Sequence, residues 1–313
     1  MLILVTAAFA WETWSAPLLH TTVSVTLPDG ADDAAAQVFA VFTEVERDCN
    51  EWLPDSPLGR LNAGAGGAPV AIPADLEALL RRSVDIAAHT DGAFDPTWAA
   101  LWALWNFDDQ TVPASADIAT GVAKVGWKRL EIGEGTARLA EPGMAVGLGG
   151  IAKGWALDRA AAALRGAGRP DFLLVAGGQV YAGGTKDGRP WQVGIRDPRG
   201  TATDTFATVA ARDVSVSTSG DYERYFIANG VRYHHILDPH TGWPTVGARA
   251  TTVVSADATL ADALSTALMV LGPERGLYIL GHFPGTEALI VDSEGKVHRT
   301  SGMPVGGLQA PRR

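Results

Sequence analysis

A turn-rich stretch between Ser217 and Pro244 constrains this chain more than any other part of it. The stretch combines small hydroxyls, glycines, carboxylates and three histidines, a composition that does not simply fill a hydrophobic core. Asp238-Pro239 and Thr241-Gly242 force tight turns, because proline fixes φ and glycine adopts the left-handed conformation. The chain must reverse sharply here, and the composition predicts a functional site.

The two parts of this stretch suit different chemistry. Between Ser217 and Gly220, backbone amides and short hydroxyls can approach an anion such as a phosphate closely. Farther on, His235 can accept a proton near neutral pH, and a well-placed general base contributes roughly 10²–10⁴-fold in rate. A lone histidine is more often a surface or core residue, but the neighbours of His234, His235 and His240 favour a functional role.

The composition excludes several classes of protein. With 47% hydrophobic and 19% charged residues among 313, the chain is an ordinary globular sequence long enough for a large core. Its net charge of -10 argues against a nucleic-acid surface, which needs clustered Lys and Arg. Because Cys49 is the only cysteine, neither an internal disulfide nor a cysteine metal cage can form.

The chain begins with an apolar segment. Residues 1–10 are too few for a membrane span, which needs about 20 apolar residues. Ala8-Phe9-Ala10 matches the A-x-A cleavage site of an export signal, but the basic segment that should precede it is missing. A truncated export signal and an apolar start without a function stay open as alternatives.

Hydrophobic spacing predicts helices and strands along most of the chain. Residues 19–27 alternate apolar and polar side chains, as in a half-buried strand. In the next predicted helix, apolar residues recur every three or four positions up to Cys49, which makes this cysteine a core residue rather than a nucleophile. Prolines and a glycine predict a loop over residues 52–62. Further helices are predicted over 73–89 and 258–271, strands over 172–178, 180–184, 191–195 and 251–254, and a hairpin over 287–297.

Residues 92–105 combine a turn with an aromatic stripe. Trp98, Leu101, Trp102 and Trp105 are spaced as on one face of a helix, and we interpret them as core packing rather than an aromatic ligand cage. Asp95 stands before a proline at the start of this segment. Its carboxylate either caps backbone amides or contacts a ligand, and both alternatives stay open.

Two other segments have the residue types of ion sites. The glycines between Gly147 and Gly154 lead into a predicted helix, whose N-terminal amides and dipole attract negative charge. In the helix predicted over 258–271, Asp262 and Thr266 are four residues apart and share one face. Such a pair is most often a solvated surface, but a carboxylate with a hydroxyl also suits a hard cation such as Mg²⁺.

Seven sequence blocks, taken in order, resemble the ApbE-type FAD:protein FMN transferases over nearly the whole chain. Each block is unspecific by itself, but their order is characteristic. The blocks are Asp55-Ser56 with Arg60-Leu61-Asn62, Gly92–Pro96, Gly149–Gly154 with Asp158-Arg159, Ala176–Gly178, Ser217–Arg224, His235–Pro239 with Thr241-Gly242, and Ala261–Thr266.

The resemblance implies a Mg²⁺-dependent enzyme that binds FAD, cleaves its pyrophosphate and attaches FMN to a Thr or Ser hydroxyl of an acceptor flavoprotein, releasing AMP. It also implies an Nqr- or Rnf-like or other flavinylated redox protein as the acceptor. By this resemblance, Asp262, Thr266 and the carbonyl of Gly150 hold the metal, and His235 deprotonates the acceptor. The flavin nucleotide site implied in the same way comprises Ala93, Phe94, Asp95, Lys153, Ser219, Gly220, Asp221 and Ile236.

Three positions depart from the common family pattern. Gly147 and Gln179 stand where Asp is frequent, and Leu19-His20-Thr21 stands where Met-Gly-Thr is frequent. The implied metal and base positions are intact, so these changes bear on FAD affinity or acceptor choice more than on catalysis.

Two alternatives to the transferase stay open. In an FAD pyrophosphatase, water replaces the acceptor hydroxyl and the products are FMN and AMP. A flavin-binding or carrier protein without turnover would lack Asp262, Thr266 or His235, whereas all three are present.

We predict an α/β fold with mixed sheets, in the ApbE-like arrangement of two interleaved subdomains with FAD between them. Strands and helices alternate too irregularly for a Rossmann fold. Residues 1–16 are assigned to a remnant of an export signal or a disordered start, 17–305 to the flavin transferase domain and 306–313 to a tail. The family's habits and the apolar start favour a periplasmic over a cytoplasmic location, with membrane association only through the N-terminus or the acceptor.

Overall fold

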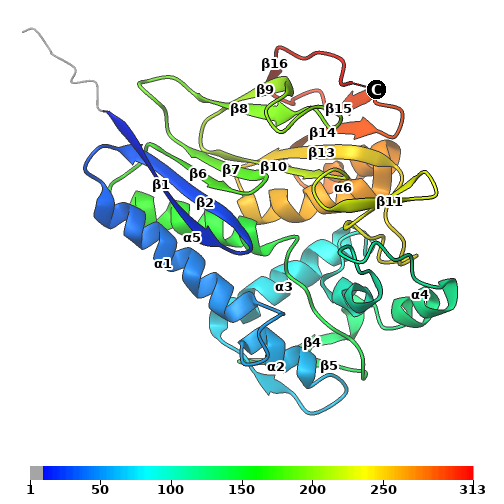
Figure 1. Cartoon of the computed structure of the whole chain (residues 1–313). Helices are drawn as coiled ribbons and strands as arrows, with labels where there is room; N and C mark the ends of the chain where they lie inside the picture. The colour runs from blue at the N-terminus through cyan, green and yellow to red at the C-terminus, as the bar shows by residue number, and fades with distance from the viewer. Residues whose placement is uncertain (1–9, 313) are drawn as a thin grey trace, which may run out of the picture.

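An eight-stranded sheet runs through the upper half of the computed structural model, which describes residues 10–312 (Figure 1). Every pair of neighbouring strands within it is antiparallel. In spatial order the strands are β1 (Trp11–Leu18), β2 (Thr21–Pro28), β6 (Phe172–Ala176), β7 (Gln179–Gly183), β10 (Val214–Gly220), β13 (Ala248–Ser255), β14 (Glu287–Asp292) and β15 (Val297–Arg299).

Each face of this sheet is covered by a different layer. Three helices lie below it in Figure 1: α1 (Asp32–Cys49), α5 (Ala152–Gly166) and α6 (Ala258–Ile279). A small sheet lies above it, with strands in the order β16 (Val305–Gly306), β9 (Thr205–Ala211) and β8 (Trp191–Arg196). Val216 and Val254 of the large sheet pack there against Ile195 and Val209 of the small one.

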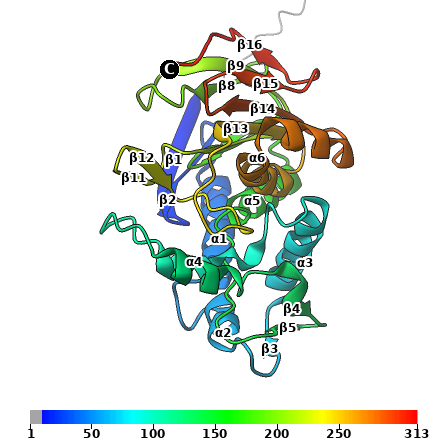
Figure 2. The same ribbon diagram turned by 90° about the vertical axis from the view of Figure 1, so that its right-hand side faces the viewer.

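The second part of the molecule, residues 50–147, lies below the helices (Figure 2). It contains α2 (Pro57–Ala63), α3 (Ala74–His89), the 3₁₀ helix η1 (Pro96–Leu104), α4 (Ser115–Val122), η2 (Trp127–Arg129) and a sheet of β3 (Val70–Ala71), β5 (Thr136–Leu139) and β4 (Leu130–Ile132). Because the chain leaves the central sheet after α1 and returns to it through α5, the two parts are interleaved. This confirms the predicted α/β fold with two interleaved subdomains, whereas the predicted mixed sheets differ from the structure, since all described strand pairs are antiparallel.

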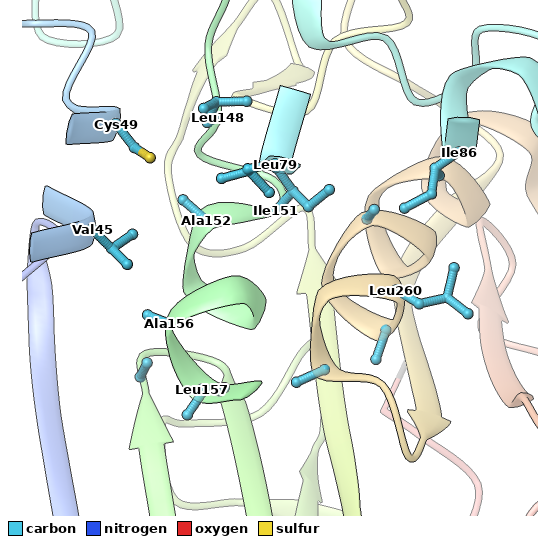
Figure 3. Packing of buried hydrophobic residues seen from close by; sticks show 14 of the residues in the cluster. Val45, Cys49, Leu79, Ile86, Leu148, Ile151, Ala152, Ala156, Leu157 and Leu260 are labelled. Carbon is cyan, nitrogen blue, oxygen red and sulfur yellow. The ribbon is translucent and has the colours of Figure 1, made fainter. Parts of the chain in front are cut away.

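The largest hydrophobic core lies where α1, α3, α5 and α6 meet (Figure 3). Val45 and Cys49 of α1 face Ala152 and Ala156 of α5, whose small side chains let the helices approach closely. Cys49 is buried in this core, which confirms the interpretation of the cysteine as a packing residue.

Helix α6 extends beyond the predicted boundary at residue 271. Its backbone kinks at Gly272, where φ is 68°, and Pro273 follows inside the second arm. The predicted helix is therefore the first arm of α6, and this arm carries the polar pair Asp262 and Thr266. The remaining described elements are the hairpin β11 (Tyr225–Ala228) and β12 (Val231–His234) and the 3₁₀ helix η3 (Leu280–His282).

Several predicted boundaries need correction. The strand predicted from residue 19 begins at Thr21, because Leu19 and His20, with φ of 51° and 57°, form the two-residue turn between β1 and β2. Residues 11–16 belong to β1, so the ordered domain begins before residue 17; residues 1–9, with most of the A-x-A motif, lie outside the described part. The predicted loop over 52–62 contains the short helix α2, which Ser56 caps through Gly59 N at 2.8 Å.

The C-terminal residues contact the small-sheet layer. The backbone N–H of Gln309 donates to Phe206 O at 2.8 Å, and that of Arg312 donates to the Asp197 carboxylate at 3.0 Å. The described portion of the predicted tail is therefore docked. Across residues 10–312, no helix has both the length and the apolar character that a membrane span requires.

Candidate active site

A cavity of about 770 Å³ opens between the sheet-bearing part and the second part of the molecule. This volume lies within the range of cofactor and ligand pockets, which is about 300–1,000 Å³. Most of the residues singled out in the sequence line this one cavity although they come from distant segments. They are Ala93, Phe94, Asp95, Gly150, Lys153, Ser219, Gly220, His235, Ile236, Asp262 and Thr266.

Asp262 forms the acidic end of the cavity. It lies in the first arm of α6 and its side chain is 2% exposed. Gly154 N donates to Oδ2 at 3.0 Å, the Gln179 amide donates to Oδ1, and Lys153 Nζ lies 3.9 Å from Oδ2. Burial raises the pKa of Asp262, whereas the Lys153 charge and the N–H donors oppose that rise. The site therefore holds a buried carboxylate beside a cation and two donors.

Gly150 and Thr266 approach each other next to this carboxylate. A Cβ atom on Gly150 would lie 3.2 Å from Thr266 Oγ1 and 3.5 Å from the Phe94 ring, so a larger residue would crowd the hydroxyl. Asp262, Thr266 and the backbone of Gly150 offer carboxylate, hydroxyl and carbonyl oxygens, the ligands that hard cations prefer. This donor set fits a hard cation such as Mg²⁺, which keeps waters or substrate phosphates as its other ligands. Among residues 10–312 there is no group of three or more His, Cys, Asp or Glu side chains placed to hold a metal together.

His235 is the only one of the three neighbouring histidines that lines the cavity in the described structure. Its backbone N–H donates to Arg224 O at 3.0 Å, and its Nδ1 atom is buried without a hydrogen-bond partner among the described residues. Burial, with Lys153 and Arg224 nearby, lowers the pKa of His235 to about 4. The imidazole is therefore neutral at pH 7 and able to accept a proton.

The other two histidines serve the structure. The buried His234 ring contacts Thr245 O at 2.8 Å and Ile236 N at 3.3 Å. His240 bridges the Asp238 carboxylate, 3.0 Å from its Nδ1, and Asp91 O, 2.8 Å from its Nε2. His234 and His240 are therefore structural residues, the alternative that is more common for a lone histidine.

The predicted anion-binding turn at Ser217–Gly220 is wrong in its secondary structure. These residues form the end of β10, and three of them, Thr218, Ser219 and Gly220, line the cavity. Asp221 points elsewhere, since its carboxylate makes two 2.7 Å contacts with the Arg199 guanidinium. The glycine segment before α5 does lie on the cavity wall, through Gly149 and Gly150.

Asp95 acts as a cap and also lies at the cavity. Its carboxylate accepts hydrogen bonds from Thr97 N at 2.7 Å and Trp127 N at 3.0 Å, which fixes the entry into η1. The capping alternative is thus established, and a ligand contact is compatible with its position on the cavity wall.

The core interpretation of the aromatic stripe is incomplete for two of its members. Trp98 and Trp102, with ring centroids 5.2 Å apart, pack partly buried against the cluster that contains Leu101 and Trp105, and they also line the cavity. The segment Pro96–Leu104 is a 3₁₀ helix and Trp105 lies beyond its end, so the four residues do not form the single face expected for an α-helix. Trp52, 5.6 Å from Trp102, also lines the cavity and was missed. Its position in a proline-rich loop offered no periodicity.

The sequence assigned no site residue to one side of the cavity, although Leu19-His20-Thr21 was noted there as a departure from the family pattern. This side is formed by the turn between β1 and β2 and by the end of α1, and no local pattern connects the two. Its residues are Leu19, His20, Thr21, Glu46, Cys49, Asn50 and Glu51.

Known proteins of one family are similar to this chain over most of its length. The model of the ApbE family matches residues 19–290. A protein of Treponema pallidum named FAD:protein FMN transferase is 37% identical over 289 residues, which cover 86% of this chain and 80% of that protein.

Two solved structures share the fold. The crystal structure of the ApbE protein from Thermotoga maritima superposes with a TM-score of 0.86 at 32% identity, covering 93% of this chain and 97% of that one. The flavin transferase ApbE from Vibrio cholerae gives a TM-score of 0.84 at 27% identity, covering 94% and 98%.

Proposed function

This chain belongs to the ApbE family, and from that membership we propose that it transfers FMN from FAD to an acceptor protein. One observation supports this most strongly: Asp262, Thr266 and Gly150, which carry oxygen donors, line the same cavity as His235, whose imidazole is neutral at pH 7. Phosphoryl-type transfer needs little more from a protein than positioning, charge neutralisation and a base.

We propose that Asp262, Thr266 and the Gly150 carbonyl hold Mg²⁺. When bound, the ion would neutralise charge on the pyrophosphate of FAD. Lys153 supplies a second positive charge, since its Nζ lies between Gly149 O at 2.6 Å and Asp262 at 3.9 Å. The backbone before α5 adds amides that favour phosphate oxygens.

In this proposal His235 takes the proton of the acceptor hydroxyl, a Thr or Ser side chain. The hydroxyl oxygen attacks the phosphorus of the FMN half, the bond from that phosphorus to the bridging oxygen breaks, and AMP leaves with this oxygen. Burial lowers the pKa of His235, so its imidazole is unprotonated at neutral pH, which is the state a base must start from.

The flavin nucleotide is proposed to lie along Ala93, Phe94, Ser219 and Ile236, which line the cavity beside these groups. An Nqr- or Rnf-like flavoprotein as acceptor and a periplasmic location belong to the same proposal. The location can be checked by fractionating cells that produce the full chain.

The decisive experiment incubates the purified protein with FAD and Mg²⁺, with and without a candidate acceptor. Nucleotides are separated by chromatography and the acceptor is weighed by mass spectrometry. An acceptor that gains the mass of FMN while AMP is released establishes the transferase. Release of FMN and AMP without labelling, over a panel of acceptors, would instead identify a pyrophosphatase, and intact FAD would identify a carrier.

A further inference from the structure

Helix α6 covers one face of the central sheet (Figure 1). At the level of the active site this face carries polar side chains. Gln179 of β7, Ser217 and Ser219 of β10 and Thr251 of β13 project toward the helix, and three of them are buried. A sheet and a helix ordinarily pack through apolar side chains. A polar layer in this place needs a specific reason, because each buried polar group must find a partner.

The layer holds α6 at a defined height over the sheet. Ser219 Oγ lies 2.8 Å from Ser265 Oγ, and the Thr251 hydroxyl donates to the backbone carbonyl of Ser265. Ser265 stands between Asp262 and Thr266 on the helix, so these bonds fix the segment that carries both proposed metal ligands.

Gln179 is the member of this layer that contacts Asp262 itself. Gln179 is 3% exposed, and it lies opposite Ser217 where β7 pairs with β10. Ser217 Oγ donates to Gln179 Oε1 at 3.3 Å, and Gln179 Nε2 donates to Asp262 Oδ1. This orientation of the amide follows from chemistry, because a carboxylate accepts hydrogen bonds and a hydroxyl beside the amide oxygen can donate one.

The two carboxylate oxygens of Asp262 are therefore held by different elements. Oδ1 is bound by Gln179 from the sheet, and Oδ2 is bound by Gly154 N from α5 at 3.0 Å. Together these donors fix the plane of the carboxylate while leaving lone pairs for a ligand in the cavity.

We infer that Gln179 is a positioning residue that orients Asp262 for the metal, with Ser217 holding the amide in turn. The inference rests on the proposed metal site. Groups that hydrogen-bond a metal ligand from behind contribute about 10–100-fold in metal affinity.

The test measures Mn²⁺ binding by titration calorimetry to the full chain without FAD, in the wild type and in Gln179→Met. Methionine keeps the length of the side chain and removes the donor, so the Mn²⁺ dissociation constant should rise by about 10–100-fold. The melting temperature serves as the readout of a merely structural change and should stay close to wild type. Gln192→Met on the exposed face of β8 is the matched control and should bind Mn²⁺ like the wild type.

Asp262→Ala separates this inference from the proposed function. If Asp262→Ala binds Mn²⁺ as well as the wild type, the metal site itself is wrong. If Asp262→Ala loses Mn²⁺ while Gln179→Met binds normally, only the positioning role of Gln179 is overturned. Should Gln179→Met not fold, Gln179→Asn and Ser217→Ala carry the test, since each weakens the same relay, and normal Mn²⁺ affinity in both would refute it.

Discussion

Substituting Gly154 by alanine tests the contact between α5 and α6 that assembles the active site. Gly154 lies in the first turn of α5, against the start of α6. A Cβ atom there would lie 2.7 Å from the carbonyl carbon of Ala258 and 2.8 Å from Thr259 Cα. Both neighbours are backbone atoms, so no side-chain rotation can make room, and the two helices must separate.

The cost can be worked out from two contributions. Overpacking in a tight core costs about 1–3 kcal/mol, and the clash with backbone places this substitution at the upper end. Separation of the helices also lengthens the 3.0 Å bond from Gly154 N to Asp262, and a hydrogen bond to a charged group contributes about 1.5–3 kcal/mol. With about 3 kcal/mol from overpacking and up to about 3 kcal/mol from the weakened hydrogen bond, we expect Gly154→Ala to lower the free energy of unfolding by about 3–6 kcal/mol.

Urea denaturation followed by circular dichroism measures this change. Gly166→Ala is the matched control, because Gly166 lies at the other end of α5 and an added Cβ meets nothing within 4 Å. It should unfold within about 0.5 kcal/mol of the wild type or be slightly more stable. If the free energy of unfolding of Gly154→Ala also lies within about 0.5 kcal/mol of the wild-type value, as expected for the control, then α5 and α6 do not approach each other this closely.

Three further predictions concern the chemistry of the site. His235→Ala should retain FAD binding, measured by fluorescence quenching, and slow FMN transfer by at least ~10²-fold; an unchanged rate excludes it as the base. Asp262→Ala should stay folded by circular dichroism and lose Mg²⁺-dependent turnover, and full activity would remove the metal assignment. Because the pKa of His235 is lowered to about 4, the unfolded chain binds a proton between pH 6.5 and pH 4 that the folded protein does not bind. The stabilising contribution of this residue is therefore present above pH 6.5 and is lost as the pH falls toward 4. Urea denaturation at pH 7 and pH 5 should therefore show a larger loss of stability in the wild type than in His235→Asn, and equal losses would contradict the lowered pKa.

Local patterns were sufficient wherever a residue's environment depends on its near neighbours in the chain. The apolar spacing that ends at Cys49 predicted α1 and the burial of that cysteine correctly, because the period of a helix is repeated in the sequence. The pair Asp262 and Thr266 was predicted on one helix face for the same reason. The ordered blocks were enough to indicate the family.

Position in the cavity could not be predicted in this way. Local composition favoured a functional role for all three histidines and the family resemblance singled out His235, but only the fold shows that His235 lines the cavity while His234 and His240 hold the backbone. The aromatic stripe was assigned to the core alone, because no local pattern shows that Trp98 and Trp102 face the cavity as well.

The sequence by itself therefore determined the family, the main helices and the residue types of the site. The tertiary structure alone decided which groups meet: Gln179 and Asp262 are 83 residues apart, and Gly154 and Asp262 are 108 apart. Such contacts are set by how α5 and α6 pack on the central sheet. The physical reason is that the spacing of residues reflects only the helix or strand to which they belong. The partner of a buried polar group depends instead on how elements distant in the chain pack together.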